Sequence, residues 1–142
     1  MFIDTSAIVA ILLAEADADA LIRRIEETRG TRYVSPLVRF EAALAIARAK
    51  TPTGGAAPAA RAALIDDGCA LVDAFIEAID ARMIDISPMI GTGAVEAVKT
   101  YGKAVGHAAD LNFGDCFSYA CARQQKVGLL YKGDDFARTD LG

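Results

Sequence analysis

The stretch Met1-Phe2-Ile3-Asp4-Thr5-Ser6-Ala7-Ile8 decides the fold class of this chain. Its first four residues, Met1–Asp4, predict a short buried strand, and Thr5 or Ser6 can cap a helix that continues through Ala7–Leu13. A strand that leads straight into a helix is the usual opening of an α/β fold. An aspartate stands at the junction, where it either caps the helix or belongs to a site at the end of the strand.

Strand and helix signals alternate along the rest of the chain. Strands separated by helices of this length favour a parallel sheet covered on both faces. Sites in such sheets form beyond the carboxyl ends of the strands, so Asp4 and Asp134, which each follow a strand, should meet. The Pro/Gly/Ala-rich segment Thr51–Pro58 is a loop rather than a domain linker. We expect helices at Asp17–Thr28, Pro36–Lys50, Ala59–Asp67, Leu71–Asp80, Pro88–Val105 and Gly114–Gln125, and further strands at Thr31–Val34, Met83–Ile86 and Gly128–Tyr131.

The composition is typical of one ordinary domain. A chain of 142 residues with 54% apolar content can bury a single core, so one domain over residues 1–142 is expected. No apolar run is long enough to span a bilayer, and the N-terminus lacks a signal-peptide pattern, which predicts a cytoplasmic protein without a membrane partner. The three cysteines form no CxxC pair, so neither a disulfide framework nor a zinc site is indicated.

The formal charge of −4 argues against a protein that coats nucleic acid by electrostatics alone. It does not exclude a nuclease, because bound divalent cations would reverse the local sign where a phosphate must sit. Positive side chains gather in two places, where they either guide a polyanion or form solvated helix faces: Arg39, Arg48 and Lys50, and Lys99, Lys103 and His107.

Four segments each carry an acid in a place where an acid does not suit its surroundings. If folding gathers these acids, they repel one another unless they are protonated or neutralised by a cation. A cluster of oxygen ligands suits Mg²⁺ or Mn²⁺, so the pattern predicts a metal-dependent enzyme. The segments are Phe2-Ile3-Asp4-Thr5-Ser6, Phe40-Glu41-Ala42-Ala43-Leu44, Asn112-Phe113-Gly114-Asp115-Cys116 and Gly133-Asp134-Asp135-Phe136.

The first two acids also have structural interpretations. Asp4 would stabilise its helix as a cap by about 1 kcal/mol, although the neighbouring hydroxyl residues could do the same. Glu41 shares the apolar stripe of its helix, where a charge is costly unless it binds a metal or pairs with Arg39 or Arg48.

The other acids are ambiguous when taken singly. Asp115 lies in the first turn of its helix, where the helix dipole favours an acid by roughly 0.3–1 kcal/mol. Asn112 could cap the same helix, and Ser118 shares a helix face with Asp115, so a polar edge could extend the site. Asp134 and Asp135 follow a glycine in an expected turn, where aspartate is common anyway.

Taken together and in order, these segments resemble the PIN-domain family. The match is closest to the VapC toxins of bacterial toxin–antitoxin pairs, covers nearly the whole chain and is strongest from Tyr101 to Leu141. The resemblance implies a three-layer α/β/α sandwich around a central, mainly parallel sheet. The residues that carry it are Asp4-Thr5-Ser6 after the first strand, Phe40-Glu41, Leu111-Asn112-Phe113-Gly114-Asp115-Cys116-Phe117-Ser118-Tyr119-Ala120, and Leu129-Leu130-Tyr131-Lys132-Gly133-Asp134-Asp135-Phe136-Ala137-Arg138-Thr139-Asp140-Leu141.

The resemblance also implies the site. Asp4, Glu41 and Asp115 match the acidic metal-site positions of the family, and the fourth acid falls in Gly133-Asp134-Asp135-Phe136. The choice between Asp134 and Asp135 stays open: both are catalytic candidates, and Asp134 is taken as the fourth metal ligand. The polar support around such a site would come from Thr5, Ser6, Asn112 and Ser118.

Members of the VapC group are Mg²⁺- or Mn²⁺-dependent endoribonucleases that act on RNA such as tRNA or ribosomal RNA. They are typically dimers held inactive by a VapB antitoxin, whose DNA-binding half represses the operon. The resemblance therefore implies an RNA substrate, a VapB-like antitoxin, a homodimer, and operator DNA bound only through the antitoxin. The chemistry of these groups predicts a mechanism in which one or two ions bind the scissile phosphate, activate a water and stabilise the departing 3′ oxygen. A carboxylate not fully engaged with metal, such as Glu41, could orient that water or accept its proton, and the assignment stays open.

Other functions fit the sequence less well. A phosphotransferase of the haloacid-dehalogenase type needs a second aspartate where this chain has Ser6. A PIN fold that serves only as a binding module would be expected to lose acids, and here every expected acid is present. His107 is the single histidine, so a mechanism with two catalytic histidines is excluded, and His107 is interpreted as a surface or RNA-contacting residue.

Overall fold

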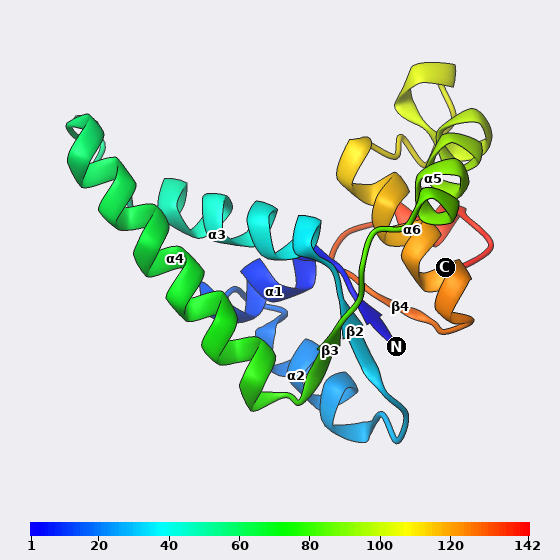
Figure 1. Cartoon of the computed structure of the whole chain (residues 1–142), viewed down its shortest axis with the longest axis horizontal. Helices are drawn as coiled ribbons and strands as arrows, with labels where there is room; N and C mark the ends of the chain where they lie inside the picture. The colour runs from blue at the N-terminus through cyan, green and yellow to red at the C-terminus, as the bar shows by residue number, and fades with distance from the viewer.

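The computed structural model of the chain describes all residues from Met1 to Gly142. At its centre lies a sheet of four parallel strands in the order β3-β2-β1-β4 (Figure 1). The strands are β1 (Phe2–Ile3), β2 (Arg32–Val34), β3 (Ala81–Met83) and β4 (Leu129–Leu130). The helices are α1 (Thr5–Leu12), α2 (Ala18–Glu27), α3 (Pro36–Lys50), α4 (Pro58–Ala78), α5 (Pro88–Tyr101) and α6 (Phe113–Gln125), with short 3₁₀ helices η1 (Lys103–Val105) and η2 (Phe136–Arg138).

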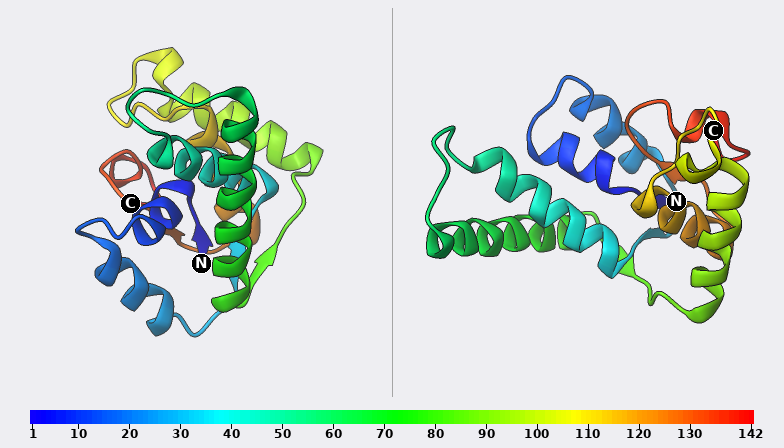
Figure 2. Two further views of the ribbon diagram at one scale, coloured as in Figure 1. Left: turned by 90° about the vertical axis from the view of Figure 1, so that its left-hand side faces the viewer. Right: turned by 90° about the horizontal axis from the view of Figure 1, so that it is seen from above.

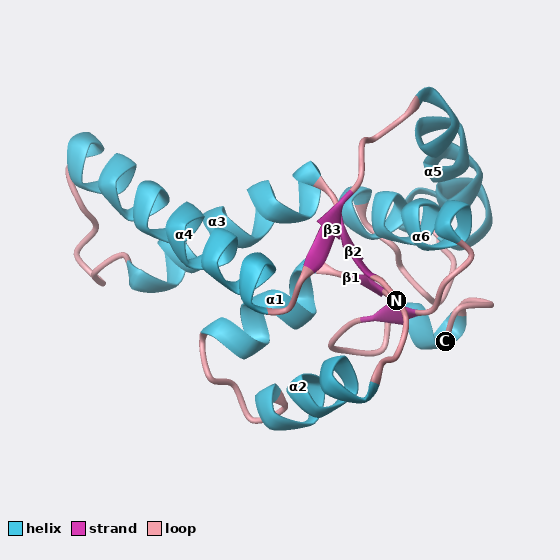
Figure 3. Ribbon diagram, turned by 60° about the horizontal axis from the view of Figure 1, so that its bottom comes forward, coloured by secondary structure: helices cyan, strands magenta, loops and turns pink.

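The strand order explains the layers. From β1 the chain adds β2 and then β3 on one side, and it then crosses back to place β4 on the other side of β1. Because crossovers between parallel strands are nearly always right-handed, this reversal moves the connecting helices to the opposite face. Helices α1 to α4 lie on one side of the sheet and α5 and α6 on the other (Figure 3), which confirms the expected three-layer α/β/α arrangement.

The core surrounds the two central strands. Phe2, Ile3 and Leu130 are fully buried, because helices cover both faces of the sheet. The pairs Phe2↔Leu129 and Ile3↔Leu130 fix the register of β1 against β4. The residues that follow these two strands therefore leave the sheet at the same edge.

Helices α3 and α4 form an antiparallel pair that projects beyond the sheet (Figure 2). Their close approach requires a glycine, because a Cβ on Gly68 would lie 2.5 Å from the carbonyl oxygen of Ala43. The prediction of two helices, Ala59–Asp67 and Leu71–Asp80, was wrong for this reason: Gly68 serves helix packing within the single helix α4 and does not end a helix. None of the helices combines the length and apolar character that a bilayer span requires.

Most other boundaries lie within one or two residues of the prediction, and two differ by more. The strand expected at Met83–Ile86 lies at Ala81–Met83, because pairing with Arg32–Val34 sets its register and Ile84 only donates its N–H to the carbonyl oxygen of Val34. The helix expected to reach Val105 ends at Tyr101, and Gly102 leads into η1. Helix α3 has the predicted bounds, with the Ser35 hydroxyl accepting from the Val38 N–H as its N-terminal cap.

A candidate acidic active site

A cavity of about 600 Å³ opens at the edge of the sheet where β1 and β4 end. Strand β1 lies at the point where the order of strands reverses, which is where open α/β sheets form their binding crevices. Four of the predicted acids line this one cavity, each from a different part of the chain: Asp4, Glu41, Asp115 and Asp135. Folding therefore gathers carboxylates that are far apart in the sequence.

Asp4 stands directly after β1 and is 3% exposed. Its Oδ2 atom accepts hydrogen bonds from the Ser6 N–H at 2.8 Å and from the Ser6 hydroxyl at 2.6 Å, so Asp4 caps α1. The Ser6 hydroxyl oxygen in turn accepts from the backbone N–H of Lys132 at 3.0 Å. The capping interpretation of Asp4 is confirmed, and the same residue lines the cavity, while its role in a functional site stays a prediction.

Glu41 enters the cavity from the middle of α3. The Thr5 hydroxyl donates to its Oε2 atom at 3.1 Å. Burial raises the pKa of this carboxyl, the Thr5 hydrogen bond opposes that rise, and the negative charge of Asp4 adds to it. Arg39 pairs with Asp73 at 2.6 Å, and no arginine forms an ion pair with Glu41.

Asp115 lies in the first turn of α6, where it forms a capping box with Asn112. The Asn112 N–H donates to Oδ2 of Asp115 at 2.8 Å, and the Asp115 N–H donates to the Asn112 side-chain oxygen at 3.1 Å. The pKa of Asp115 is raised to about 6. Burial is the largest cause, the charges of Asp4, Asp135 and Glu41 add to the rise, and the Asn112 hydrogen bond opposes it. The ionised form of Asp115 is therefore less favourable here than in water, and a nearby cation would stabilise it.

The three best-positioned acids share one arrangement. In Asp4, Glu41 and Asp115, a single carboxylate oxygen takes every hydrogen bond from the protein. The other oxygen of each carboxylate accepts no hydrogen bond from the protein: Oδ1 of Asp4, Oε1 of Glu41 and Oδ1 of Asp115. Supporting bonds of this kind orient a carboxylate and leave one oxygen for an external ligand. Thr5 and Ser6 through their hydroxyls and Asn112 through its N–H hold these carboxylates, while their role as the polar support of a metal site stays a prediction.

The structure separates the two adjacent aspartates. Asp135 lines the cavity, and its charge is among those that raise the pKa of Asp115. Asp134 does not line the cavity, and its carbonyl oxygen accepts from the Ala137 N–H at the start of η2. Gly133 before them has a φ of 97°, a left-handed conformation that favours glycine in this turn. The geometry thus favours Asp135 over Asp134 as the fourth acid, and the metal-ligand assignment itself stays a prediction.

Ser118 does not take part in the cavity. Its side chain is buried, and its hydroxyl is the one buried side-chain oxygen or nitrogen without a hydrogen-bond partner. Its position one helical turn after Asp115 suggested a shared polar face, but the residue points into the packed interior. The polar edge predicted for α6 therefore stops at its first turn.

Sequence reasoning missed an ion pair at the cavity wall. Lys132 lines the cavity together with Glu15, and its ammonium group pairs with Glu15 and lies 3.6 Å from Asp17. Its position between β4 and the Gly133 turn was the available signal, because residues after a parallel strand face the site edge. Arg48 also lines the cavity, two helical turns after Glu41; it had been considered as a guide for a polyanion, as part of a solvated helix face or as a partner of Glu41, and it forms no ion pair with Glu41.

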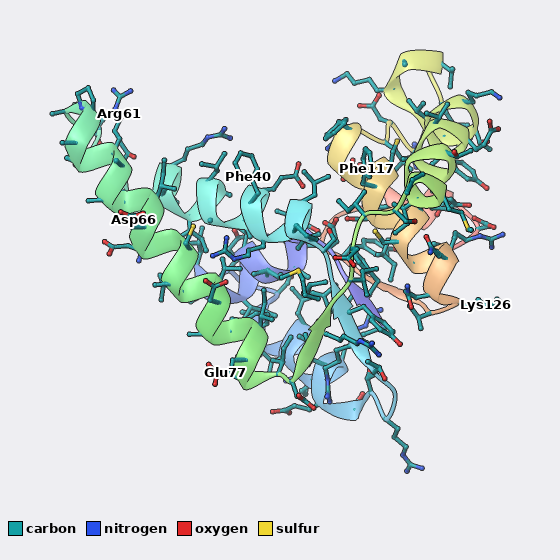
Figure 4. The ribbon with its side chains drawn as sticks, in the orientation of Figure 1. Phe40, Arg61, Asp66, Glu77, Phe117 and Lys126 are labelled. Atoms are coloured by element: carbon teal, nitrogen blue, oxygen red, sulfur yellow. The ribbon has the colours of Figure 1, made fainter.

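The donor set fits a hard divalent cation in its chemistry. Carboxylate oxygens are the ligands that Mg²⁺ and Mn²⁺ prefer. Burial, together with neighbouring negative charge, raises the pKa values of Glu41 and Asp115, so a bound cation would stabilise their ionised forms. In their present positions, however, no three His, Cys, Asp or Glu side chains converge closely enough to hold a metal ion. Closing such a site requires side-chain adjustment. Phe40, which lines the cavity beside Glu41, projects from α3 away from α4 (Figure 4).

The fold agrees with comparisons to known proteins. The sequence model of the PIN domain matches residues 1–141, and the chain belongs to the PIN domain family. Over its whole length it is similar to VapC ribonucleases. It is 46% identical to one from Rhizobium meliloti, with 99% of each chain covered, and 34% identical to ribonuclease VapC42 of Mycobacterium tuberculosis, with 99% of this chain and 96% of the relative covered.

A solved structure supports the fold independently. The crystal structure of Mycobacterium tuberculosis VapC20, a sarcin-ricin loop cleaving toxin, superimposes with a TM-score of 0.67 and covers 99% of this chain and 95% of that one. The two chains are 18% identical, so this likeness concerns the fold. The predicted resemblance to PIN-domain VapC toxins is confirmed by these matches.

Proposed function

We propose that this protein is a divalent-metal-dependent endoribonuclease that acts as the toxin of a toxin–antitoxin pair. The observation that carries the proposal is the meeting of Asp4, Glu41, Asp115 and Asp135 in one cavity at the reversal point of the sheet. The relatives that match over the whole chain are named as VapC ribonucleases, which supports RNA as the substrate. We further propose tRNA or ribosomal RNA as the substrate class, in line with the family resemblance.

The charge of the cavity supports a metal requirement. Five acids and two bases line it, so a phosphodiester would be repelled unless the acids were neutralised. Asp4, Glu41, Asp115 and Asp135 would hold Mg²⁺ or Mn²⁺ through the oxygens that the protein leaves free. One or two such ions would supply Lewis-acid stabilisation of the charge that develops on the scissile phosphate and the departing 3′ oxygen.

The protein's own groups would position the reactants. Thr5 holds Glu41 through Oε2, which leaves Oε1 able to orient a water or accept its proton. Ser6 and Asn112 hold Asp4 and Asp115 in the same way. The negative charge of Glu41 raises the pKa of Asp115, so a proton bound here belongs to this pair of carboxyls rather than to one residue.

The resemblance to VapC toxins also supports a set of partners. We propose a VapB-like antitoxin that inhibits the protein, a homodimer, contact with operator DNA only through the antitoxin, and a cytoplasmic location. These proposals rest on the relatives and not on the cavity. A search for a neighbouring gene that encodes a small DNA-binding protein, followed by co-purification of its product with the chain, tests the antitoxin, and light scattering of the chain with and without it tests the dimer.

The alternative functions fit the structure less well. A haloacid-dehalogenase-like phosphatase would need a catalytic acid at residue 6, where the Ser6 hydroxyl donates to Asp4 and supports it. A catalytically silent binding module would have no need for four carboxylates held in one cavity at a cost in electrostatic repulsion.

Incubation of total cellular RNA with the purified protein tests the proposal. The arms are Mg²⁺ or Mn²⁺, a chelator, and the Asp4→Asn variant with metal. We expect discrete fragments that require both the metal and Asp4, with a loss on the order of a hundredfold or more in the variant. Asparagine caps helices as well as aspartate does, so the variant should keep its fold. Intact RNA in every arm, from a folded protein that binds metal, would favour the silent module.

A further inference from the structure

Lys132 is held at the cavity wall by acids that have no part in the proposed chemistry. Its ammonium group pairs with Glu15 and lies 3.6 Å from Asp17, both in the connection between α1 and α2. The Glu15 hydrogen bond raises the pKa of Lys132, so the group stays protonated. The Lys132 side chain is 34% exposed and Glu15 is 36% exposed, so water and a ligand can reach the pair.

The backbone of Lys132 is anchored separately from its side chain. The Lys132 N–H donates to the Ser6 hydroxyl, and the Asp4 N–H donates to the carbonyl oxygen of Leu130 at 2.9 Å. These bonds place Lys132 beside Asp4 at the sheet edge whatever its side chain does. Because a lysine ammonium sits on a flexible stem, it can leave Glu15 while its own backbone and Asp4 stay in place.

Folding does not require this ion pair. Exposed pairs contribute little to stability, and the Lys132–Glu15 pair is accessible to solvent. A nucleic-acid strand in this acidic cavity, in contrast, needs cations for the phosphates that the metal does not neutralise. Arg48 and Lys132 are the only cationic residues that line it, and Lys132 is the one next to Asp4.

We propose that Lys132 binds a backbone phosphate of the RNA beside the scissile bond, and that Glu15 holds its ammonium group in the free protein. When the substrate binds, the Lys132 ammonium group would leave the Glu15 carboxylate and pair with the RNA phosphate. The inference rests on the proposed ribonuclease function and adds to it a substrate-binding residue and an acid that competes with the substrate. The simpler structural view treats Lys132–Glu15 only as a link between the α1–α2 connection and β4.

A binding experiment distinguishes the phosphate-binding role of Lys132 from a purely structural one. It follows the binding of a fluorescein-labelled RNA oligonucleotide of randomised sequence over a series of salt concentrations at constant Mg²⁺. All variants carry Asp115→Asn so that cleavage does not disturb the measurement. The test set is Lys132→Met, Lys132→Arg, Glu15→Gln and the double variant Lys132→Met/Glu15→Gln. The matched control is Lys99→Met with Glu96→Gln, a lysine–glutamate pair on α5 that does not line the cavity. Thermal unfolding of each variant reports the fold.

We expect Lys132→Met to weaken binding about tenfold, as the loss of one charge-assisted hydrogen bond predicts. The slope of log affinity against log salt concentration should also become less steep by about 0.7, the value for one phosphate contact on a single strand. Lys132→Arg should restore the slope, and the control pair should leave it unchanged. Glu15→Gln should strengthen binding several-fold when Lys132 is present and should have little effect in the double variant.

Other results would overturn the inference. A salt slope for Lys132→Met equal to that of the control variants would show that Lys132 does not contact phosphate. An equal gain from Glu15→Gln with and without Lys132 would show simple relief of repulsion rather than release of the lysine. If the unmodified protein neither cleaves total RNA nor binds the oligonucleotide, the proposed function itself fails and this inference falls with it. If the unmodified protein cleaves RNA but Lys132→Met leaves the salt slope unchanged, only the proposed role of Lys132 is rejected and the proposed function stands.

Discussion

The carboxylate of Glu41 on α3 lies directly against the backbone of Gly114 at the start of α6, with no space for a methyl group between them. A Cβ on residue 114 would lie 2.5 Å from Oε1 and 2.6 Å from Oε2 of Glu41. The two helices lie on opposite sides of the sheet, so this contact joins the two outer layers at the cavity (Figure 1). It also brings Glu41 beside Asp115, the residue that follows the glycine.

Gly114→Ala should therefore reduce cleavage without unfolding the protein. The added methyl group meets only the flexible end of Glu41, which can turn aside at little cost. Alanine is favoured over glycine in helices by up to about 1 kcal/mol, so the thermal midpoint should stay the same or rise. We expect cleavage of RNA to fall about tenfold or more because Glu41 is displaced from its hydrogen bond with Thr5.

Gly91→Ala on α5 is the matched control, because a Cβ there meets no atom within 4 Å. It should raise stability by a similar amount and leave cleavage unchanged. Full activity in Gly114→Ala would mean that the present position of Glu41 does not matter for the reaction.

The raised pKa of Asp115 makes the stability of the metal-free protein depend on pH. Between its ordinary value of 3.8 and about 6, the folded protein keeps a proton on Asp115 that the unfolded chain has lost. The free energy of unfolding should therefore fall as pH rises through this window. A pKa difference of this size corresponds to roughly 3 kcal/mol, which partial solvent exposure reduces to about 1 kcal/mol.

Asp115→Asn removes this titration and keeps an oxygen for the Asn112 N–H. Denaturant unfolding should show the variant to be more stable than the parent protein at pH 7 in a chelator, and equal to it at low pH where both carry no charge at this position. Added Mg²⁺ should stabilise only the parent protein. A parent protein that gains stability between pH 4 and 6 would contradict the pKa shift.

The two adjacent aspartates should respond differently to the same substitution. Asp135→Asn should reduce cleavage of total RNA on the order of a hundredfold, because Asp135 lines the cavity and would hold the metal. Asp134→Asn should keep cleavage within about threefold of the parent protein, since the carbonyl oxygen that accepts from Ala137 is unchanged. The reverse order of activities would restore Asp134 as the fourth ligand.

The two predicted serines form another matched pair. Ser6→Ala leaves the Lys132 N–H without its acceptor and removes one of the two bonds to Asp4, which should cost about 1–2 kcal/mol of unfolding free energy and reduce cleavage. Ser118→Ala removes a buried hydroxyl that has no partner, so stability should stay within about 0.5 kcal/mol or rise. Calorimetry of both variants checks the contrast, and equal losses would indicate that burial rather than hydrogen bonding sets the effect.

Most of the site was accessible to sequence reasoning because its residues lie at strand and helix ends. Asp4 and Asp115 occupy capping positions that local patterns reveal, and both contribute to the cavity. Ser118 and Lys132 show the limit of this reasoning. A helical turn places Ser118 on the same side as Asp115 but does not say where the neighbouring helix covers it. The partners of Lys132 come from the α1–α2 connection, more than a hundred residues earlier in the chain.

The sequence by itself determined the alternation of strands and helices, the α/β class and three of the five acids that line the cavity, because these depend on local periodicity, capping and the order of motifs. Only the tertiary structure decided that α4 continues through Gly68, that β3 lies at Ala81–Met83, and that Asp135 rather than Asp134 faces the cavity. Each of these depends on contacts between distant segments: helix packing against Ala43, pairing with β2, and the turn at Gly133. Local sequence sets which structures a segment can adopt, and the packing of its partners selects among them.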